Sequence, residues 1–436
     1  MSIKGYETMF WLIETKEQIE YLINKQYEDA FIEIIPYHHK IHPSFNDVCS
    51  VYYKPLNSAK GYMLCLNHSE ALNVSKTLID TLFKQTKWLW VRDKKNALYY
   101  FPIKNMLDVN FITPTYIQAP PQTPTHTHFQ NKYPDYKKIN KIIPLVKHYQ
   151  ICEEIFKSIE PYFTKELPPY FDFYNNKTTL AFFGIERNGI HINEELIQQY
   201  FNVSKDYYSI NDEYIYTQYN LYTTTCRPSN AFNSINFAAL NKDNGSRKSF
   251  IPKNNKFVEI DISAYHPHLV AQLIGFDFGD QDVHQVFADM YGTTYQKAKE
   301  LTFKQLYGGI FKEYEHLEFF QKVQQYKDNI WREFNNLGEV IVPNSSYVFK
   351  KDKLEEMNPQ KLLNYILQNL ETSTNVNILM EIHKLLRGKN TKIVLYTYDS
   401  FLVDYDEDEE LIEDIEDIFR KMNLKIKVKD GTNYDF

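Results

Sequence analysis

The chain has 436 residues, of which 43% are hydrophobic and 16% aromatic, so it holds enough apolar material for two or three domains with buried cores. Its 49 Lys and Arg residues against 56 Asp and Glu residues give a formal net charge of −7, which argues against a nucleic-acid partner unless positive charge is gathered locally. Four separated cysteines and the lack of a long apolar run exclude a disulfide framework, a zinc knuckle and a membrane span.

The first 163 residues are expected to form an α/β domain. Residues 1–14 lack the basic flank and the cleavage site of a secretory signal, which predicts an intracellular protein without a membrane partner. The apolar runs that follow predict three strands and then a helix, at 30–35, 48–53, 61–66 and 71–84. Residues 117–138 are polar and rich in proline, so they are expected to form a long loop or linker.

The rest of the chain alternates helices with a few strands. Thr294 and Asn358 are suitable N-caps, and glycines follow the two helices that they begin. The predicted elements, in chain order, are helices at 142–163 and 180–199, an irregular stretch at 204–230, a strand at 256–261, a helix from Thr294 to the Gly308-Gly309 pair, a helix from Asn358-Pro359 to Gly388, and strands at 392–397 and 401–404.

Two aspartates at predicted strand ends indicate a candidate site for metal-dependent phosphoryl transfer. Phosphoryl transfer from a nucleoside triphosphate uses two hard cations, and carboxylates at strand tips can hold them. Asp261 ends one strand and Asp399 lies in the turn of the C-terminal hairpin, so both can project into one cleft. Magnesium is the natural ion, because it prefers oxygen ligands. Taken singly, each aspartate is more simply explained as a solvated residue at a strand end.

The predicted helix between these aspartates has one face with a distinctive composition. Tyr295, Lys299, Phe303 and Tyr307 recur at steps of four, so one side of the helix carries a cation and three aromatic rings. A lysine there can meet triphosphate oxygens while the rings cover a base and a sugar. By itself, such an aromatic stripe more often packs in a core.

The order of strand with Asp, helix with Lys and hairpin with Asp resembles motifs A, B and C of the family A DNA polymerases, the DNA polymerase I class. The three matching segments are Asp261-Ile262-Ser263, the pattern Lys299, Phe303, Tyr307 and Gly308, and Tyr398-Asp399-Ser400. Further matches, from about residue 30 to the C-terminus, are Glu186 to Ile190, Thr225-Cys226-Arg227-Pro228-Ser229, Asp282-Val283-His284, the pair Asn364 and Gln368, and residues 428–434.

The resemblance implies a function for these segments. Residues 164–436 would form an α+β right-hand polymerase domain with palm, fingers near 270–320 and a minimal thumb, since little chain lies between Ile190 and Arg227. It would add deoxynucleotides to a primer–template DNA with two Mg²⁺ ions, for which Mn²⁺ can substitute. Whether a processivity partner replaces the thumb is left open, and a role in phage, plasmid or organelle DNA replication is compatible with the sequence.

The resemblance also assigns roles to individual residues. Catalysis and metal binding would fall to Asp261, Ile262 and Asp399. Nucleotide binding would fall to Lys299, Phe303, Tyr307, His284, His266 and Ser263, and contact with nucleic acid to Arg227, Asn364, Gln368 and Gly308.

Three positions depart from the family pattern. His266 replaces the acidic residue of motif A that gates the sugar, Tyr295 replaces an Arg of motif B, and Ser400 replaces the Glu after the aspartate of motif C. We therefore expect altered metal affinity and looser selection of the sugar. In the alternative, His266 lies in the core beside Pro267 and touches no nucleotide.

The first domain resembles the 3′-to-5′ exonuclease domain of the family, with its RNase H-like fold, but its acidic motifs are degenerate. Ile32-Glu33-Ile34 stands where an acidic pair belongs, Ala97 lies near the position of another Asp, and residues 148–154 lack a Tyr-x-x-x-Asp motif. A two-metal nuclease needs these carboxylates. The sequence therefore predicts a polymerase without proofreading.

Two other interpretations stay open at this point. Asp399-Ser400-Phe401 also resembles the His-Asp-Ser-Phe segment of single-subunit RNA polymerases, so the enzyme could be sugar-permissive or make RNA. The negative net charge, the short thumb and Ser400 also permit a catalytically dead relic that only binds nucleic acid. Primer extension distinguishes the three.

Overall fold

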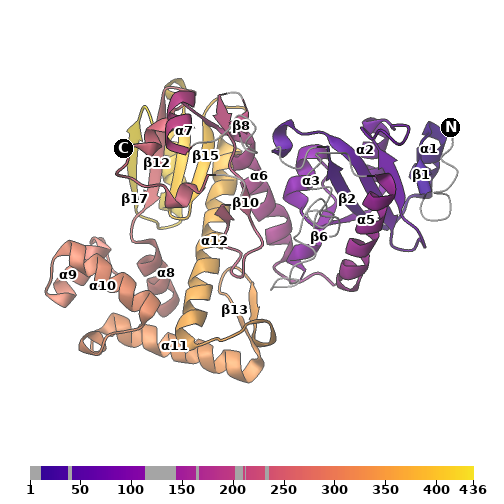
Figure 1. Cartoon of the computed structure of the whole chain (residues 1–436). Coiled ribbons are helices and arrows are strands. Elements are labelled where there is room, and N and C mark those ends of the chain that lie inside the picture. The colour runs from indigo at the N-terminus through magenta and orange to yellow at the C-terminus, as the bar shows by residue number, and fades with distance from the viewer. Residues whose placement is uncertain are drawn as a thin grey trace. The chain divides into compact units, whose positions relative to one another are not determined.

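The computed structural model describes residues 11–37, 42–112, 144–163, 166–201, 210–211, 213–230 and 235–436. The chain forms two compact units (Figure 1), one made of residues 1–179 with 205–211 and the other of residues 180–204 with 212–436. The predicted boundary after residue 163 falls within the first unit, and the proline-rich segment 117–138 lies outside the described residues. No helix in the described ranges is long and apolar enough to cross a membrane.

The first unit is built on a six-stranded sheet in the order β1-β4-β3-β2-β5-β6. The pairs β4/β3 and β3/β2 are antiparallel, while β1/β4, β2/β5 and β5/β6 are parallel. The strands are β1 (Trp11–Ile13), β2 (Asp29–Pro36), β3 (Val48–Pro55), β4 (Tyr62–Cys65), β5 (Trp88–Val91) and β6 (Met106–Asp108). The strands predicted at 30–35, 48–53 and 61–66 are thus confirmed.

Amphipathic helices pack on this sheet and close its core. Ile19 and Leu22 of α1 and Ile79 of α2 are buried against Ile32 and Leu64 of the strands. The helical segments of the unit are α1 (Lys16–Lys25), α2 (Lys76–Gln85), α3 (Lys94–Tyr100), α5 (Leu145–Ile159), a π-helical turn at Phe173–Thr178, and short 3₁₀ turns at Pro43–Phe45, Val109–Phe111 and Glu160–Tyr162; the two-residue strand β8 (Ile210–Asn211) also falls here. This order of elements agrees with the expected α/β class.

The second unit contains an antiparallel sheet in the order β15-β16-β12-β17. These strands are β12 (Lys256–Ile262), β15 (Lys392–Thr397), β16 (Ser400–Tyr405) and β17 (Ile426–Gly431). Shorter strands also pair in this unit: β7 (Ile190–His191) with β9 (Tyr214–Ile215), β10 (Tyr219–Asn220) with β11 (Ser229–Asn230), and β13 (Glu339–Ile341) with β14 (Val348–Lys350).

A long helix links this sheet to a helical region. Figure 1 shows α12 (Pro359–Leu385) running from the sheet to α11 (Glu318–Leu337). Helices α8 (Tyr265–Ile274) and α10 (Tyr295–Gly308) contact α12, and α9 (Val283–Tyr291) packs on α10. The remaining helices are α6 (Thr179–Asn188), α7 (Glu194–Phe201) and α13 (Ile412–Lys421), and 3₁₀ turns lie at Phe237–Ala239, Ser246–Ser249, Lys312–Tyr314, Lys351–Lys353 and Glu407–Glu409.

The predicted N-caps are confirmed in the second unit. The Thr294 hydroxyl accepts a hydrogen bond from the Lys297 backbone N–H at the start of α10, at 3.4 Å. The Asn358 side chain does the same for Lys361 at the start of α12, at 2.8 Å. The strand predicted at 256–261 and the hairpin strands are β12, β15 and β16.

The single helix predicted at 180–199 is wrong. The chain leaves α6 at Asn188, forms β7, and starts α7 only at Glu194. Gly189 adopts φ +65°, a left-handed conformation that ends a helix and that glycine adopts without steric cost. Asn193 then caps the next helix, since its side-chain oxygen accepts a bond from the Leu196 N–H at 3.1 Å.

Candidate active site

Strand pairing brings the two predicted aspartates to one end of the sheet of the second unit. Asp261 of β12 lies opposite Ser400 of β16, and the Ile262 N–H donates to the Asp399 carbonyl at 2.8 Å. Tyr398 has φ +66°, a left-handed conformation that lets the hairpin turn directly in front of Asp399. The two aspartates are therefore close in space although they are 138 positions apart in the sequence.

Both carboxylates are harder to ionise than a free aspartate, and Asp399 contributes to this at Asp261. Burial raises the pKa of Asp261 to about 6, and the charges of Asp399 and Glu259 add to this. Burial also raises the pKa of Asp399, with a further contribution from Glu371. Asp261 is half-buried and Asp399 is exposed, and the charge of Asp399 disfavours ionisation of Asp261. A cation between the two carboxylates would stabilise both charges, so the pair fits a divalent metal ion.

Ile262, the third member of the predicted metal set, and Ser400, which replaces the Glu of the family pattern, contribute less. Ile262 can offer only its backbone carbonyl, and Ser400 donates its hydroxyl to Glu259 at 2.9 Å. In the described part of the chain, no three His, Cys, Asp or Glu side chains are grouped as a metal site. Two carboxylates suit Mg²⁺, which usually keeps several waters and takes further oxygens from a bound phosphate.

The raised pKa of Asp261 predicts how stability depends on pH without metal. The folded protein binds this proton more tightly than the unfolded chain, whose ordinary value is 3.8, so the folded state loses stability as pH rises toward about 6. Above that pH the folded state carries the full penalty. Asp261→Asn removes the charge, so we expect it to raise the melting temperature at pH 8 in EDTA, with a smaller gain at pH 4.5.

Thermal unfolding of the wild type and the Asp261→Asn variant at both pH values checks this expectation. Added Mg²⁺ should raise the melting temperature of the wild type more than that of the variant, because a ligand stabilises the state that binds it. A variant that is no more stable than the wild type at pH 8 would contradict the described electrostatics.

The aromatic stripe of α10 is not core packing. Lys299 and Tyr307 are exposed and Phe303 is half-buried, whereas the opposite face of the helix buries Ala298 and Leu306. The Phe303 and Tyr307 rings are parallel, with centroids 6.0 Å apart. The stripe is therefore available to a flat ligand.

His284 of α9 faces this stripe. Its ring lies 5.6 Å from the Tyr295 ring and 6.3 Å from the Phe303 ring. The side chain is 6% exposed, and its Nδ1 has no hydrogen-bond partner among the described residues. Burial and the charge of Lys299 lower its pKa, so the neutral ring is favoured. A buried nitrogen without a partner suits a ligand group that the protein itself does not supply.

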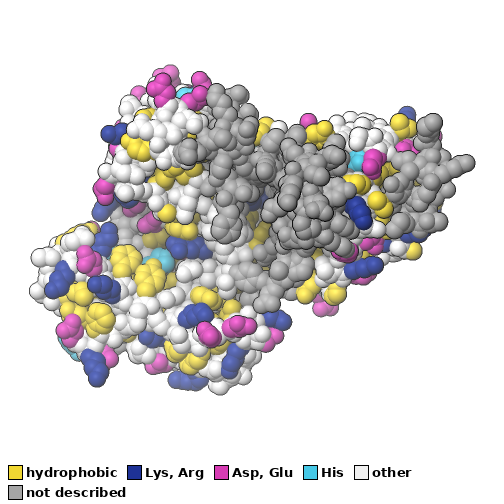
Figure 2. Space-filling model, viewed as in Figure 1, with side chains coloured by type: hydrophobic (Ala, Val, Ile, Leu, Met, Phe, Trp, Pro, Cys, Tyr) yellow, Lys and Arg dark blue, Asp and Glu magenta, His cyan; other side chains and the backbone are white. Residues whose placement is uncertain are grey.

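Three lysines act electrostatically on this region. Lys242 and Lys427 lower the pKa of Asp261 against the effect of burial, and Lys299 and Lys427 both act on His284. Lys427 of β17 lies directly opposite Asp261 in the sheet. Figure 2 shows a face of the second unit where hydrophobic, histidine and basic side chains lie together below the sheet. Positive charge is thus gathered here in a chain whose net charge is negative.

Of the residues assigned to nucleic acid, Asn364 and Gln368 lie on α12, Arg227 lies in the loop that packs on it, and Gly308 ends α10. Gln368 accepts a hydrogen bond from the Thr225 hydroxyl at 3.0 Å, and Asn364 donates to the Tyr307 carbonyl at 3.3 Å. Gly308 is exposed, and a side chain there would meet nothing within 4 Å. The Ser263 backbone N–H donates to the Lys425 carbonyl at 2.8 Å.

His266 is buried at 7% exposure but is not a simple core residue. Its Nδ1 is hydrogen-bonded to the Tyr307 hydroxyl, and its Nε2 lies 2.6 Å from Oε2 of Glu371. Oε1 of Glu371 accepts from Arg227 at 3.2 Å, and the Arg227 guanidinium stacks 3.7 Å from the Tyr398 ring centre. The looser sugar selection expected from His266 stays a prediction.

Glu371 was missed by the sequence analysis. It follows Gln368 by three residues on α12 and is 1% exposed. The apolar spacing of this helix is interrupted by buried polar residues between Ile366 and Ile378, and a charged residue inside such a gap is the signal that could have revealed it.

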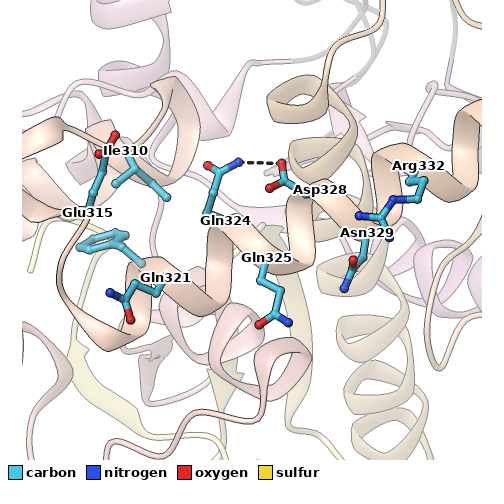
Figure 3. A pocket seen from close by; sticks show the side chains of 9 residues that line it. Ile310, Glu315, Gln321, Gln324, Gln325, Asp328, Asn329 and Arg332 are labelled. Atoms are coloured by element: carbon cyan, nitrogen blue, oxygen red, sulfur yellow. Dashed lines mark hydrogen bonds between the residues drawn. The ribbon is translucent and has the colours of Figure 1, made fainter.

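A separate pocket of about 620 Å³ lies along α11 (Figure 3). Amide side chains dominate its lining, and the carboxylate of Asp328 is bound by Gln324 at 2.8 Å. The lining residues are Ile310, Glu315, Phe320, Gln321, Gln324, Gln325, Asp328, Asn329 and Arg332. None of them belongs to the predicted site, so this pocket does not compete with the aspartate pair as a phosphoryl-transfer centre.

Comparison with known proteins supports the fold independently of the motifs. No family model matches the sequence, and no curated protein matches it. The structure is similar to the POL domain of Pol1 from M. smegmatis, solved in complex with DNA primer-template and dNTP, with a TM-score of 0.71 and 11% identity over 97% of this chain and 99% of that one. At this identity the likeness shows the fold, which is that of a DNA polymerase I POL domain, as the resemblance of the motifs implied.

Proposed function

We propose that this chain is a template-directed, primer-dependent DNA polymerase that adds deoxynucleotides by phosphoryl transfer. The observation that carries the proposal is the aspartate pair, Asp261 and Asp399, whose pKa values are raised by burial and by carboxylate charge beside Lys427. The similar POL domain was solved with DNA primer-template and dNTP, which supports the same partners here. Both partners are found inside cells, so we also propose an intracellular location.

The carboxylates of Asp261 and Asp399, with the carbonyl of Ile262, would hold two Mg²⁺ ions or Mn²⁺ in their place. When bound, these ions lower the pKa of the primer 3′-hydroxyl and neutralise charge that develops on the triphosphate. The protein's own part is to orient the reactants and to exclude water, which contributes much of the catalysis in phosphoryl transfer.

The side chains of α9 and α10 would bind the incoming nucleotide. The Lys299 ammonium suits the triphosphate oxygens, since charge-assisted hydrogen bonds are the strong ones. The neutral His284 ring, with its unpaired Nδ1, suits a further phosphate oxygen if it carries the hydrogen there. The parallel rings of Phe303 and Tyr307 offer a stacking surface for the base.

Arg227, Asn364, Gln368 and Gly308 would contact the primer–template. Arg227 supplies a cation for the phosphate backbone, and the amides of α12 offer donors and acceptors to the edges of base pairs. Gly308 leaves the backbone open to close approach. The lysines near the aspartates compensate locally for the negative net charge of the chain.

Primer extension with Mg²⁺ tests this function. A labelled primer on a DNA template is incubated with deoxynucleotides or with ribonucleotides, and the products are sized. Extension with deoxynucleotides supports the proposal. Extension with ribonucleotides alone would favour the RNA polymerase alternative suggested by Asp399-Ser400-Phe401, and binding without extension would favour a dead relic.

We further propose that the first unit is a degenerate exonuclease domain without proofreading activity. Glu33 of β2 is bound by the buried Arg92, whose Nε donates to Oε2 at 2.9 Å, so this carboxylate is already neutralised. Ile32 lies in the hydrophobic core and Ala97 is buried on α3, at positions where the resemblance asks for acids.

The full chain is therefore expected to leave a 3′-labelled or mismatched primer intact in Mg²⁺ without nucleotides. The check is a time course of primer length, with a proofreading polymerase as the positive control. Shortening of the primer that a substitution in the first unit abolishes would refute this prediction, whereas shortening that survives such substitutions would indicate a contaminating nuclease.

A further inference from the structure

A continuous chain of hydrogen bonds joins four side chains from four different segments. It runs from the Tyr307 hydroxyl of α10 to Nδ1 of His266 on α8, from Nε2 of that ring to Oε2 of Glu371 on α12, and from Oε1 of Glu371 to Arg227. The two ends of the chain are the residues with access to solvent, since Tyr307 is 37% exposed and the Arg227 side chain 28%.

The centre of this chain is a fully buried charge. Glu371 is 1% exposed, and each of its two oxygens faces a different partner. Burying a carboxylate is expensive unless it is paired and hydrogen-bonded, and Arg227 supplies the opposite charge. Burial lowers the pKa of Arg227, but Glu371, through its charge and its hydrogen bond, together with Tyr396 and Tyr398 raises it overall. Because burying this charge lowers stability unless it is paired, the Glu371 carboxylate points to a role beyond packing.

The carboxylate fixes the direction of the hydrogen bonds. An ionised carboxylate can only accept, so Nε2 of His266 must carry a hydrogen. In the neutral ring Nδ1 is then the acceptor, and the Tyr307 hydroxyl donates to it. With the neutral ring, the hydroxyl hydrogen points inward, and both lone pairs of the Tyr307 oxygen are left to accept hydrogen bonds.

We propose that Glu371 is a positioning residue that, through His266, fixes the Tyr307 ring and the polarity of its hydroxyl at the nucleotide surface. This inference rests on the proposed function, since Tyr307 matters there as part of the surface that receives the nucleotide. Because the same carboxylate holds Arg227, one buried group sets the positions of a nucleotide-facing and a nucleic-acid-facing side chain.

Glu371→Gln isolates the branch through His266. The glutamine oxygen can still accept from Arg227, which turns its NH₂ group toward His266. That group is a donor, so Nε2 must become an acceptor, Nδ1 must carry the hydrogen, and the Tyr307 hydroxyl bond reverses. Glu381→Gln is the matched control, because Glu381 lies on the same helix, its side chain is 54% exposed, and it forms an ion pair with the exposed Lys384.

The first measurement is NMR of the full chain labelled with ¹⁵N-histidine, at pH 8, with the His266 signals identified as those lost in His266→Asn. We expect Nε2 of His266 to carry a hydrogen in the wild type and in Glu381→Gln but not in Glu371→Gln. An unchanged His266 ring in folded Glu371→Gln overturns the proposal. If that variant does not fold, Tyr307→Phe decides, since it removes one hydroxyl and no charge: an unaltered Nδ1 signal overturns the proposal.

The second measurement is steady-state incorporation. Glu371→Gln should raise the KM for the nucleotide about tenfold, the equivalent of a charge-assisted hydrogen bond, with kcat little changed, while Glu381→Gln matches the wild type. If the His266 ring of Glu371→Gln has changed its protonated nitrogen but the KM for the nucleotide is unchanged, the positioning role is overturned. An inert wild type would instead refute the proposed function, and the NMR result would still decide whether Glu371 governs His266.

Discussion

Asp261→Asn and Asp399→Asn are each expected to reduce nucleotide incorporation by roughly 10²–10³-fold or more, the effect of removing one preorganised charge or donor from a catalytic site. Each substitution keeps the shape of the side chain and removes one of the two charges that would hold the metal ions. Both aspartates lie at one end of the same sheet, so both can contact the same metal ions and each substitution should lower the rate.

Single-turnover primer extension with saturating nucleotide measures this effect. Asp408→Asn is the matched control, because Asp408 is an exposed residue of a 3₁₀ turn and not part of the predicted site. Melting temperatures distinguish lost chemistry from lost folding, and Asp261→Asn is expected to be the more stable protein at pH 8. Wild-type rates in either folded variant would show that the aspartate pair is not the reaction centre.

The elements that sequence predicted well are those with local signals. Thr294 and Asn358 cap α10 and α12 where expected, and β12 ends near Asp261 because its alternation is complete within one short segment. The prediction failed at 180–199, where apolar residues continue with helical spacing but Gly189 takes a left-handed conformation. Glycine is permitted in a helix and favoured at its end, so spacing alone cannot tell the two apart.

The sequence predicted only those parts of the candidate site whose chemistry is visible in single residues. The aspartates and the α10 stripe have a chemistry that is visible in the sequence, whereas their partners depend on tertiary contacts. Ser400 binds Glu259 and His266 binds Glu371 across more than a hundred residues of chain. The contact with Glu371 of α12 decides whether His266 replaces an acid of the family pattern or works together with one. No local sequence pattern indicates that contact.

The net charge of −7 is likewise a weak guide to partners. Lys242, Lys299 and Lys427 come from three separate parts of the sequence, yet each acts on Asp261 or His284. Their charges add at one place because β17 pairs with β12 and α10 packs against α9. A local concentration of charge of this kind is what a polyanionic substrate meets, and the total charge conceals it.

Lys299→Ala should weaken nucleotide use by roughly 10- to 150-fold in kcat/KM, because a charge-assisted contact contributes about 1.5–3 kcal/mol. Lys299 is exposed on the face of α10 that carries Phe303 and Tyr307, and nothing in its burial suggests a structural role. Most of the loss should fall on KM if the lysine binds the triphosphate equally in the ground state and the transition state, and on kcat if the contact tightens during transfer.

Lys304→Ala is the matched control for this prediction, since Lys304 is an exposed lysine of the same helix outside the stripe. Both variants lose one positive charge, so a general effect of charge on DNA binding would lower their activities alike and would weaken with added salt. A specific triphosphate contact predicts instead that only Lys299→Ala loses nucleotide affinity while its affinity for primer–template stays that of the wild type. Equal losses of activity in the two variants would mean that the lysines of α10 contribute only a general positive electrostatic potential. The nucleotide would then have to bind elsewhere on the second unit.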